Sequence, residues 1–389
     1  MNNWKCCLLG DILTLQRGHD LTYRQTKNGD IPVVGSNGII AYHDTPTTKA
    51  PCVTIGRSGN IGHAFYYDCD CWAHNTVLYV KDFKGTHPKF AYYLLKSMSF
   101  GQYNAGSAVP TLNRNHIHSI EIKYPPLPVQ KKIASILSSL DDKIELNTRM
   151  NNVLEEIARA LFRRWFVAFE FPDNEGKPYK SAGGKMVESE MGSVPEGWNV
   201  RKLNDISKEI ICGKTPSTKI LEYYGNSTPF ITIPDMHNQV YAISTERYLS
   251  INGVQSQPKK TIPKNSICVS CIATPGLVCL TAKNSQTNQQ INSIVCKDEI
   301  SPYFIYFSML NISEFICTLG SSGSTTSNLN KGQFSKIKLI IPSCEIMKEF
   351  DKITSPIFKQ IKGNQIESQM LTEVRDTLLP KLMSGEIEV

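Results

Sequence analysis

The stretch Pro128–Phe166 reads PVQKKIASILSSLDDKIELNTRMNNVLEEIARALFRRWF, and it contains no internal glycine or proline. Proline at its start suits the first turn of a helix. Steps of four and three residues pick out ten positions, eight of them apolar: Ile133, Leu137, Leu140, Ile144, Asn147, Asn151, Leu154, Ala158, Leu161 and Trp165. Such a heptad seam is typical of a coiled-coil helix, and a helix of this length spans roughly 58 Å at about 1.5 Å per residue.

A second seam follows later in the chain, with six apolar positions among ten: Phe350, Thr354, Ile357, Ile361, Asn364, Ser368, Leu371, Arg375, Leu378 and Leu382. Pro356 lies in its early part and predicts a break or kink there. The polar centres of the two seams coincide, with Asn147 and Asn151 against Asn364 and Ser368. We expect an antiparallel coiled coil in which these four residues fix the register. The alternative is that they are solvated where the helices diverge.

The chain also contains an internal repeat. GSAVPTLN at Gly106–Asn113 returns as GSTTSNLN at Gly323–Asn330. WKCCLLGDI at Trp4–Ile12 matches WNVRKLNDI at Trp198–Ile206 in Trp, Leu, Asp and Ile. The matches keep their order along the chain, so one unit is duplicated. The period is too long for a solenoid and suits a molecule with two-fold pseudo-symmetry.

Each repeat begins with a globular body and ends with a long helix. Short apolar runs such as APCVTIG and TVLYV predict strands, and HPKFAYYLLKSM at His87–Met98 predicts a helix. The expected fold is therefore α+β, with two pseudo-repeated bodies separated by two long helices. The predicted segments are body 1 (1–127), a central helix (128–170), a connector (171–197), body 2 (198–343) and a distal helix (344–389).

The basic charge is concentrated in the two bodies. The chain carries 42 Lys and Arg against 35 Asp and Glu, a net charge of +7. Residues 1–127 contain 12 basic and 8 acidic side chains, and residues 196–343 contain 14 and 9. Two basic bodies joined by nearly neutral segments are compatible with binding a polyanion at two places.

The cysteines and the apolar runs predict the cellular compartment of the protein. The start MNNWKCCLLGDILTL lacks the pattern of a signal peptide, and no apolar run approaches membrane-spanning length. We therefore expect a cytoplasmic protein with no membrane partner, whose 12 cysteines are reduced. CVSC at Cys268–Cys271 has zinc-knuckle spacing, but no second pair follows it and SICVSCIAT favours a buried strand.

Three motifs resemble the specificity (S) subunit of type I restriction-modification enzymes. They are the run from PPLPVQKKIASIL to RRWFVAFEFP, the connector GKPYKSAGGKMVESEMGSVPEGW and the terminal LLPKLMSGEIEV. The resemblance covers nearly the whole chain in order. It implies that each body is a target recognition domain, and that both read one bipartite, asymmetric sequence in double-stranded DNA. It also implies that the helices set the spacer between the half-sites.

The same resemblance implies the partners. Two methyltransferase (M) subunits would dock on the helices, carry S-adenosylmethionine and methylate adenine N6. Restriction (R) subunits, with ATP and Mg²⁺, would add translocation and cleavage. The S subunit itself would hold no cofactor or metal and perform no chemistry.

Catalytic motifs are weak in this sequence. KYPPLP at Lys123–Pro128 lacks the Asn/Asp-Pro-Pro-aromatic pattern of an adenine methyltransferase, and GRSGNIG at Gly56–Gly62 lacks the lysine of a P-loop. The nuclease-like EIK at Glu121–Lys123 returns as KLI in the repeat, and His116 and His118 are the one pair of histidines at ligand spacing. A DNA-reading scaffold is favoured. A divergent nuclease or methyltransferase, and a coiled-coil adaptor for proteins, remain alternatives.

Polar loop residues of both bodies are the candidate DNA contacts, because Arg, Asn, Gln and Lys read base edges and Ser and Thr bind phosphates. In body 1 they are Arg17, His19, Arg24, Gln25, Arg57, Ser58, Ser107, Thr111, Asn113 and Arg114. In body 2 they are Lys214, Thr215, Ser217, Lys219, Gln289, Gln290, Ser324, Thr325 and Asn328. The repeated peptide is predicted to be a polar DNA-facing loop anchored by Leu112 or Leu329, or else a structural turn before the last strand. Because the loops differ, the two half-sites should differ.

Overall fold

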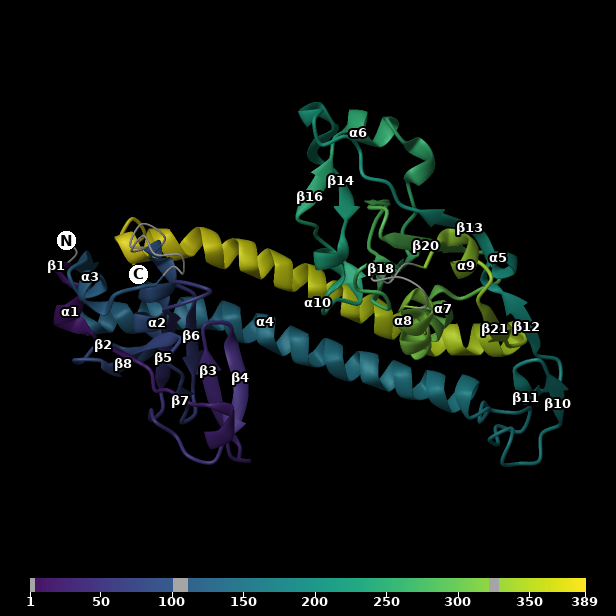
Figure 1. The fold of residues 1–389 in the computed structure, drawn as a ribbon, viewed down its shortest axis with the longest axis horizontal. Helices are drawn as coiled ribbons and strands as arrows, with labels where there is room; N and C mark the ends of the chain where they lie inside the picture. The colour runs from purple at the N-terminus through teal and green to yellow at the C-terminus, as the bar shows by residue number, and fades with distance from the viewer. Residues whose placement is uncertain (1–3, 101–110, 322–328) are drawn as a thin grey trace. The chain divides into compact units, whose positions relative to one another are not determined.

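The computed structural model describes residues 4–100, 111–321 and 329–389 (Figure 1). The chain forms two compact units, and each is described by itself. Unit 1 consists of Met1–Ile144 and Met370–Val389, and unit 2 consists of Glu145–Gln369. Body 1 thus lies within unit 1, and body 2 lies within unit 2.

Body 1 contains three small sheets with strand orders β2-β8-β5-β6, β4-β3-β7 and β1-β9. The strands are β1 (Lys5–Leu8), β2 (Thr14–Arg17), β3 (Ile31–Gly35), β4 (Gly38–His43), β5 (Cys52–Gly56), β6 (Ala64–Tyr67), β7 (Trp72–Ala73), β8 (Val77–Asp82) and β9 (Glu121–Tyr124). Its helices are α1 (Leu9–Ile12), η1 (Tyr23–Gln25), α2 (Pro88–Ser97) and α3 (Arg114–His118). All five residues of β5 are buried, with Val53 and Ile55 in the core that includes α2 and Cys52 in a second core with Val34 and Ala73, so the strand and helix predictions here are confirmed.

The helix α4 (Leu127–Phe162) starts directly on body 1. The buried side chain of Gln130 joins three segments of unit 1. Its Nε2 donates to the carbonyl oxygen of Pro125 at 2.9 Å, and its Oε1 accepts from the backbone N–H of His87 at 3.0 Å. Ile133 of α4 and Leu382 of the last helix enter the same apolar core. Body 1 therefore packs on the beginning of one long helix and the end of the other.

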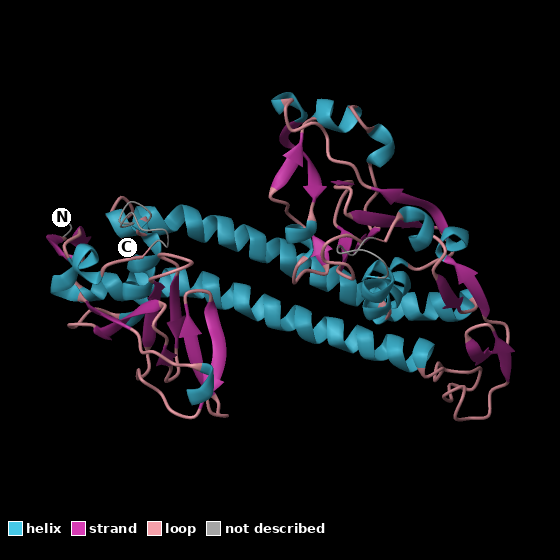
Figure 2. Ribbon diagram, in the orientation of Figure 1, coloured by secondary structure: helices cyan, strands magenta, loops and turns pink. Residues whose placement is uncertain are grey.

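Body 2 has the same arrangement of three sheets as body 1, with additional elements, and Figure 2 draws both bodies by secondary structure. Its strand orders are β13-β20-β17-β18-β15, β16-β14-β19 and β12-β21. The strands are β12 (Asn199–Lys202), β13 (Ser207–Cys212), β14 (Tyr224–Ile231), β15 (Tyr241–Ala242), β16 (Arg247–Leu249), β17 (Ile267–Ser270), β18 (Val278–Thr281), β19 (Gln286–Thr287), β20 (Ile291–Cys296) and β21 (Lys338–Ile341). The helices are α5 (Leu203–Ile206), η4 (Leu221–Tyr223), η5 (Ile233–Met236), α6 (Ile251–Gln255), η6 (Pro258–Lys260), α7 (Pro302–Asn311), α8 (Ser313–Ser321) and α9 (Lys331–Phe334).

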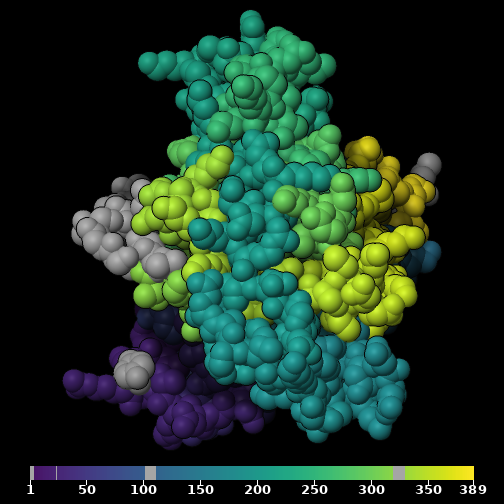
Figure 3. Space-filling model, turned by 90° about the vertical axis from the view of Figure 1, so that its right-hand side faces the viewer, coloured from purple at the N-terminus to yellow at the C-terminus, as the bar shows by residue number. Residues whose placement is uncertain are grey.

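Several of these elements, η5 among them, have no counterpart among the described residues of body 1. The strand β15 extends the larger sheet, and α6 and η6 lie in the longer segment between β16 and β17. The connector before body 2 forms a hairpin of β10 (Met186–Ser189) and β11 (Gly192–Pro195). Figure 3 shows one face of unit 2, where residues of this connector, drawn in teal, lie at the surface.

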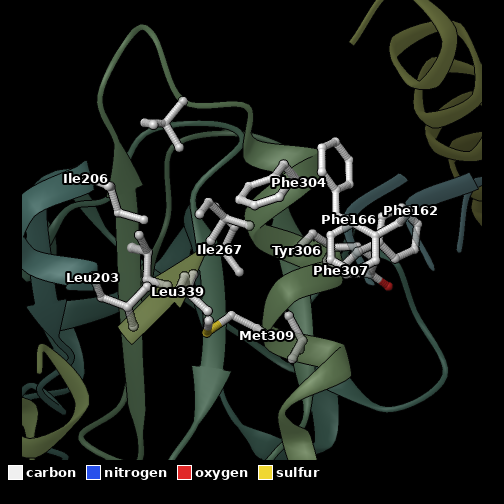
Figure 4. Packing of buried hydrophobic residues seen from close by; sticks show 14 of the residues in the cluster. Phe162, Phe166, Leu203, Ile206, Ile267, Phe304, Tyr306, Phe307, Met309 and Leu339 are labelled. Atoms are coloured by element: carbon white, nitrogen blue, oxygen red, sulfur yellow. The ribbon is translucent and has the colours of Figure 1, made fainter. Parts of the chain in front are cut away.

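The core of unit 2 is rich in aromatic side chains (Figure 4). Phe166 follows α4, and its ring centroid lies 4.8 Å from that of Phe304 in α7 and 4.9 Å from that of Phe350 in the last helix. Burying one such side chain contributes roughly 1.5–3 kcal/mol. Leu203 and Ile206 of α5 belong to the same cluster, so the helices and the sheet of body 2 share one core.

Both long helices form as the heptad pattern predicts. All ten positions of each seam are buried or half-buried. Within unit 2 the contacts run in antiparallel order, because Asn147 meets Ser368 while Phe162 meets Phe350. A five-residue π-helical turn, η3 (Arg163–Val167), follows α4.

Of the break or kink predicted at Pro356, the break is wrong, because α10 runs without interruption from Cys344 to Ser384. A proline removes one helical hydrogen bond and crowds one carbonyl, and both effects are local. Thr354 and Phe358 on either side are fully buried against the core of unit 2. This packing holds the helix through the proline.

The CVSC motif lies in the core, as predicted. All four residues of β17 are buried, and the Cys271 side chain is also buried. Among the described residues no disulfide is formed, and no group of His, Cys, Asp or Glu could hold a metal ion. In the same part of the chain no helix is long and apolar enough to span a membrane.

Candidate nucleic-acid interface

Several candidate residues of body 1 meet at the turn between β7 and β8. The turn is His74–Thr76, and the chain that leaves β2 folds onto it. The backbone N–H of Gly18 donates to the Val77 oxygen at 3.0 Å, and that of His19 donates to the Ala73 oxygen at 2.7 Å. We call residues 17–20, 57–58, 74–76 and 111–112 corner 1.

The polar side chains of corner 1 are linked by hydrogen bonds and an ion pair. Arg17 Nη2 lies 3.1 Å from Asp20 Oδ1, and the side-chain amide of Asn75 donates to the same oxygen. Arg57 Nη1 donates to the Asn75 backbone oxygen at 3.5 Å. The hydrogen bond from Asn75, followed by the charge of Arg17, lowers the pKa of Asp20. Burial lowers the pKa of His74, so its imidazole is neutral at neutral pH.

The end of the repeated peptide closes corner 1. The backbone N–H of Arg57 donates to the Thr76 oxygen at 2.8 Å, and that of Leu112 donates to the Arg57 oxygen at 2.9 Å. Ser58 and Thr111 form a β-bridge beside them. The Leu112 side chain is buried, as an apolar anchor should be. The next residue, Asn113, caps α3 through its side-chain oxygen, which accepts from the Asn115 N–H at 3.0 Å.

Body 2 has the same corner with other side chains. Gly213 N–H donates to the Ile291 oxygen at 3.0 Å, and Lys214 N–H donates to the Thr287 oxygen at 2.9 Å. Cys271 N–H donates to the Gln290 oxygen at 2.8 Å, as Arg57 does to Thr76. We call residues 212–215, 271, 288–290 and 329 corner 2.

The anchor of the repeated peptide also returns in corner 2. Leu329 is buried, and its N–H donates to the Cys271 oxygen at 3.0 Å. The side-chain oxygen of Asn330 accepts from the Gln333 N–H at 3.0 Å and caps α9. The Leu-Asn end of the repeated peptide is therefore an anchor followed by a helix cap in both bodies.

The side chains at equivalent places in the two corners differ. His19 corresponds to Lys214, Asp20 to Thr215, Arg57 to Cys271 and Asn75 to Gln289. In corner 2 the hydroxyl of Thr215 donates to Gln289 Oε1 at 2.7 Å. Gln290 Oε1 accepts from the Asn288 side-chain amide at 2.9 Å. One backbone frame thus presents two different sets of polar groups.

Other predicted residues lie outside the corners. Arg24 is exposed on η1, and Gln25 Oε1 there accepts from the Thr22 hydroxyl at 2.8 Å. Arg114 is exposed at the start of α3, and Ser217 and Lys219 are exposed in the loop after β13. Four candidates lie outside the described residues: Ser107, Ser324, Thr325 and Asn328.

The histidines at ligand spacing, His116 and His118, lie on the short helix α3. His118 Nε2 accepts from the Leu15 backbone N–H at 2.9 Å, and burial lowers the pKa of its ring. This ring nitrogen is used in packing α3 against β2. His116 lies on the same helix and is exposed.

Sequence reasoning missed some residues of the corners. Asn75 was overlooked, although shifting TNQQIN back by the repeat offset points directly to AHNTVL. Lys259 and Lys260 were also missed because η6 has no counterpart in body 1. Lys260 Nζ donates to the Cys212 oxygen at 2.8 Å, and Gln257 Nε2 donates to the Lys214 oxygen at 2.7 Å. The Lys260 contact adds positive charge beside corner 2.

The four polar residues predicted for the helix register meet within unit 2. Asn147 Nδ2 lies 2.8 Å from Glu367 Oε2 and 3.3 Å from Ser368 Oγ. Asn364 Nδ2 donates to Asn151 Oδ1 at 2.9 Å. Asn147 and Asn364 are buried, so the alternative of solvated positions does not describe them.

The match to a known protein family falls on two separate segments, and each segment includes one of the two bodies. The family described as the type I restriction modification DNA specificity domain matches residues 1–156 and 195–375. The chain belongs to this family. It is a specificity subunit of a type I restriction-modification system, as its motifs suggested.

Relatives of this specificity subunit occur in distant organisms. The HindI specificity subunit of Haemophilus influenzae is 39% identical over 357 residues, with 77% of each chain covered. The MjaIX specificity subunit of Methanocaldococcus jannaschii is 29% identical over 321 residues, with 78% of this chain and 70% of that one covered. The crystal structure of the S subunit from M. genitalium has a TM-score of 0.64 at 16% identity, covering 98% of this chain and 96% of that one, and it shows the shared fold.

Proposed function

We propose that this specificity subunit reads a bipartite, asymmetric target in double-stranded DNA, one half with each body, and performs no catalysis itself. The observation that carries this proposal is the equivalence of the two corners. The same backbone hydrogen bond joins Arg57 to Thr76 in one body and Cys271 to Gln290 in the other, directly beside Asn75 and Gln289. A shared frame with different side chains is what two readers of different half-sites require.

The chemistry of the corners suits base edges. The major groove presents a distinct pattern of donors, acceptors and methyl groups for each base pair, and amide and guanidinium groups distinguish them. Arg17 and Arg57 in corner 1, and Lys214 with Lys259 and Lys260 near corner 2, also attract the phosphates. The basic excess of both bodies supports the same partner.

The helices would set the distance between the readers. The polar contacts around Asn147 and Asn364 support a role in register, because another register would leave buried amides without partners. One turn of DNA is about 34–36 Å, and a helix of 36 residues spans roughly 54 Å, so helices of this length can bridge neighbouring turns.

An exposed apolar stripe on α4 supports docking of a methyltransferase subunit. Leu146, Met150, Val153 and Ile157 are spaced as a heptad and are 47%, 38%, 55% and 53% exposed. Such a stripe on a helix suits the apolar face of a partner helix. In this assembly the S-adenosylmethionine and the adenine N6 chemistry belong to the M subunits, and ATP and Mg²⁺ belong to the R subunits.

Co-expression with M subunits and mapping of N6-methyladenine in the host DNA tests the proposal. We expect one motif made of two different half-sites separated by a fixed gap. Variants of corner 1 should change one half-site, and variants of corner 2 should change the other. A complex that forms but methylates no split motif would refute the two-reader proposal and favour a protein adaptor.

A further inference from the structure

Asp20 and Asn75 form a hydrogen-bonded polar pair in corner 1. The Asp20 carboxylate accepts from the Asn75 side-chain amide and from Arg17. Among the described residues, the side-chain oxygen of Asn75 has no hydrogen-bond partner in the structure. Asn75 is half-buried, and the Asp20 side chain that holds its amide is exposed.

The charge on Asp20 decides how this amide is oriented. Its lowered pKa keeps the carboxyl ionised at neutral pH, and an ionised carboxylate can only accept hydrogen bonds. The amide NH₂ of Asn75 must therefore face Asp20. Turning the amide over would place its oxygen against a negative oxygen, so the side-chain oxygen of Asn75 faces away from Asp20.

We propose that Asn75 is a specificity-determining residue that selects an amino base, adenine or cytosine, and that Asp20 is the positioning residue that fixes this choice. The inference rests on the proposed function. An outward acceptor pairs with a donor, and the donors in the major groove are the N6 amino group of adenine and the N4 amino group of cytosine. Guanine and thymine present acceptors at the corresponding edge and are rejected.

The equivalent pair in body 2 lacks this constraint. Thr215 donates to Gln289 Oε1, which leaves the Gln289 NH₂ outward as a donor. A hydroxyl group can also accept, so Gln289 can turn over and present its oxygen instead. Corner 2 therefore accepts either kind of base at this place, whereas corner 1 accepts one kind.

The first test replaces Asp20 in the full S subunit assembled with its M subunits. Asp20→Asn keeps the shape but allows Asn75 to turn over. We expect the wild type to methylate sites with adenine or cytosine at one position of half-site 1 at least about tenfold better than sites with guanine or thymine, which is the discrimination of one good base contact. The variant should lose most of this ratio, while the rest of the motif stays unchanged.

Two further variants separate positioning from stability. Asp20→Glu keeps the carboxylate and should retain much of the selectivity. Asp30→Asn removes the same charge at an exposed place in body 1 and should change nothing. A merely structural role of Asp20 would lower methylation at all sites equally and leave the base ratio intact, and this result would overturn the inference.

The reciprocal test introduces the constraint into body 2. In Thr215→Asp a carboxylate should hold the Gln289 NH₂ and turn its oxygen outward. Half-site 2 should then gain a preference for adenine or cytosine at one position. If the wild type methylates no split motif, the proposed function fails. If it does, but neither Asp20→Asn nor Thr215→Asp alters the base ratio, only the present inference fails.

Discussion

Gly18 and Gly213 occupy the same place in the two bodies, where the chain leaving the first sheet strand crosses the turn before the last one. A Cβ atom on Gly18 would lie 2.1 Å from the backbone oxygen of His74, and one on Gly213 would lie 2.1 Å from that of Asn288. Side chains cannot fit there. The glycines therefore allow the close approach that builds each corner, although their sequence neighbours differ.

Gly18→Ala should destabilise unit 1 by about 1–3 kcal/mol, the usual cost of overpacking, because the obstructing atom is backbone. Thermal denaturation of the full chain measures the change. Gly363→Ala is the matched control, since no atom of the described residues lies within 4 Å of a Cβ there and alanine favours the helix by about 0.8–1 kcal/mol. Equal melting temperatures for the two variants would contradict the close approach at Gly18.

Arg57→Ala should weaken DNA binding by about 1–3 kcal/mol and relax one position of half-site 1, if Arg57 reads a base. Titration of the assembled complex at several salt concentrations measures the affinity. Arg149→Ala removes the same charge from α4, where Arg149 pairs with Glu145, and serves as the control. An affinity that stays unchanged at every salt concentration would remove Arg57 from the interface.

The buried carboxyl of Asp351 should make the stability of unit 2 depend on pH. Burial raises the pKa of this carboxyl, against the effect of its hydrogen bond with Ser301. The Asp351 carboxyl therefore keeps its proton to a higher pH in the folded state than in the unfolded state. The stability that the protonated carboxyl contributes is lost as pH rises through the raised pKa. Asp351→Asn should melt at a higher temperature than wild type near neutral pH, and this gain should shrink in acid. A gain that is the same at all pH values, or one matched by the exposed control Glu299→Gln, would contradict this assignment.

The long helices show how one element can carry two patterns. The inward seam was visible in the sequence, because its heptads are long and regular. The outward stripe at Leu146, Met150, Val153 and Ile157 follows the same spacing. Sequence alone did not separate the stripe from the core, because a helix with apolar residues on two faces can bury either. Solvent exposure in the structure separates them.

Val153→Glu combined with Ile157→Glu should abolish or strongly weaken co-purification with the M subunits, since two charges would be buried in the docked helix pair. The matched control adds the same charge to the same helix through Asn152→Glu and Ala160→Glu. Both chains should retain the helical circular dichroism of the wild type. Normal co-purification of the stripe variant would exclude this face as the docking surface.

The duplication organises the molecule, and most of it could be predicted from the sequence. The repeat offsets located both bodies, both helices and the anchors Leu112 and Leu329. The corners could be predicted only in part, because they depend on hydrogen bonds between strands that are distant in the sequence. The continuity of α10 through Pro356 was also beyond sequence reasoning, since tertiary packing overrides the local effect of the proline.

A graft tests the duplication. Replacing Asn199–Ile341 by Lys5–Tyr124 should give a chain with two copies of body 1, because both segments begin and end on equivalent paired strands. Its methylation target should then consist of two copies of half-site 1. Sequencing of methylated host DNA would show it. A retained wild-type half-site 2 would show that recognition in body 2 does not reside between β12 and β21.

The longer segment between β13 and β17 in body 2 indicates how such proteins can evolve by insertion. Its ends are fixed by strands that both bodies share, and lengthening a closed loop adds only about 0.6 kcal/mol of entropic cost for each doubling. The additional residues include η6, whose Lys260 reaches the edge of corner 2. A lineage can therefore enlarge one DNA-reading surface by insertion while the sheet and both helices keep their geometry. New specificity then arises without a new fold and with little loss of stability.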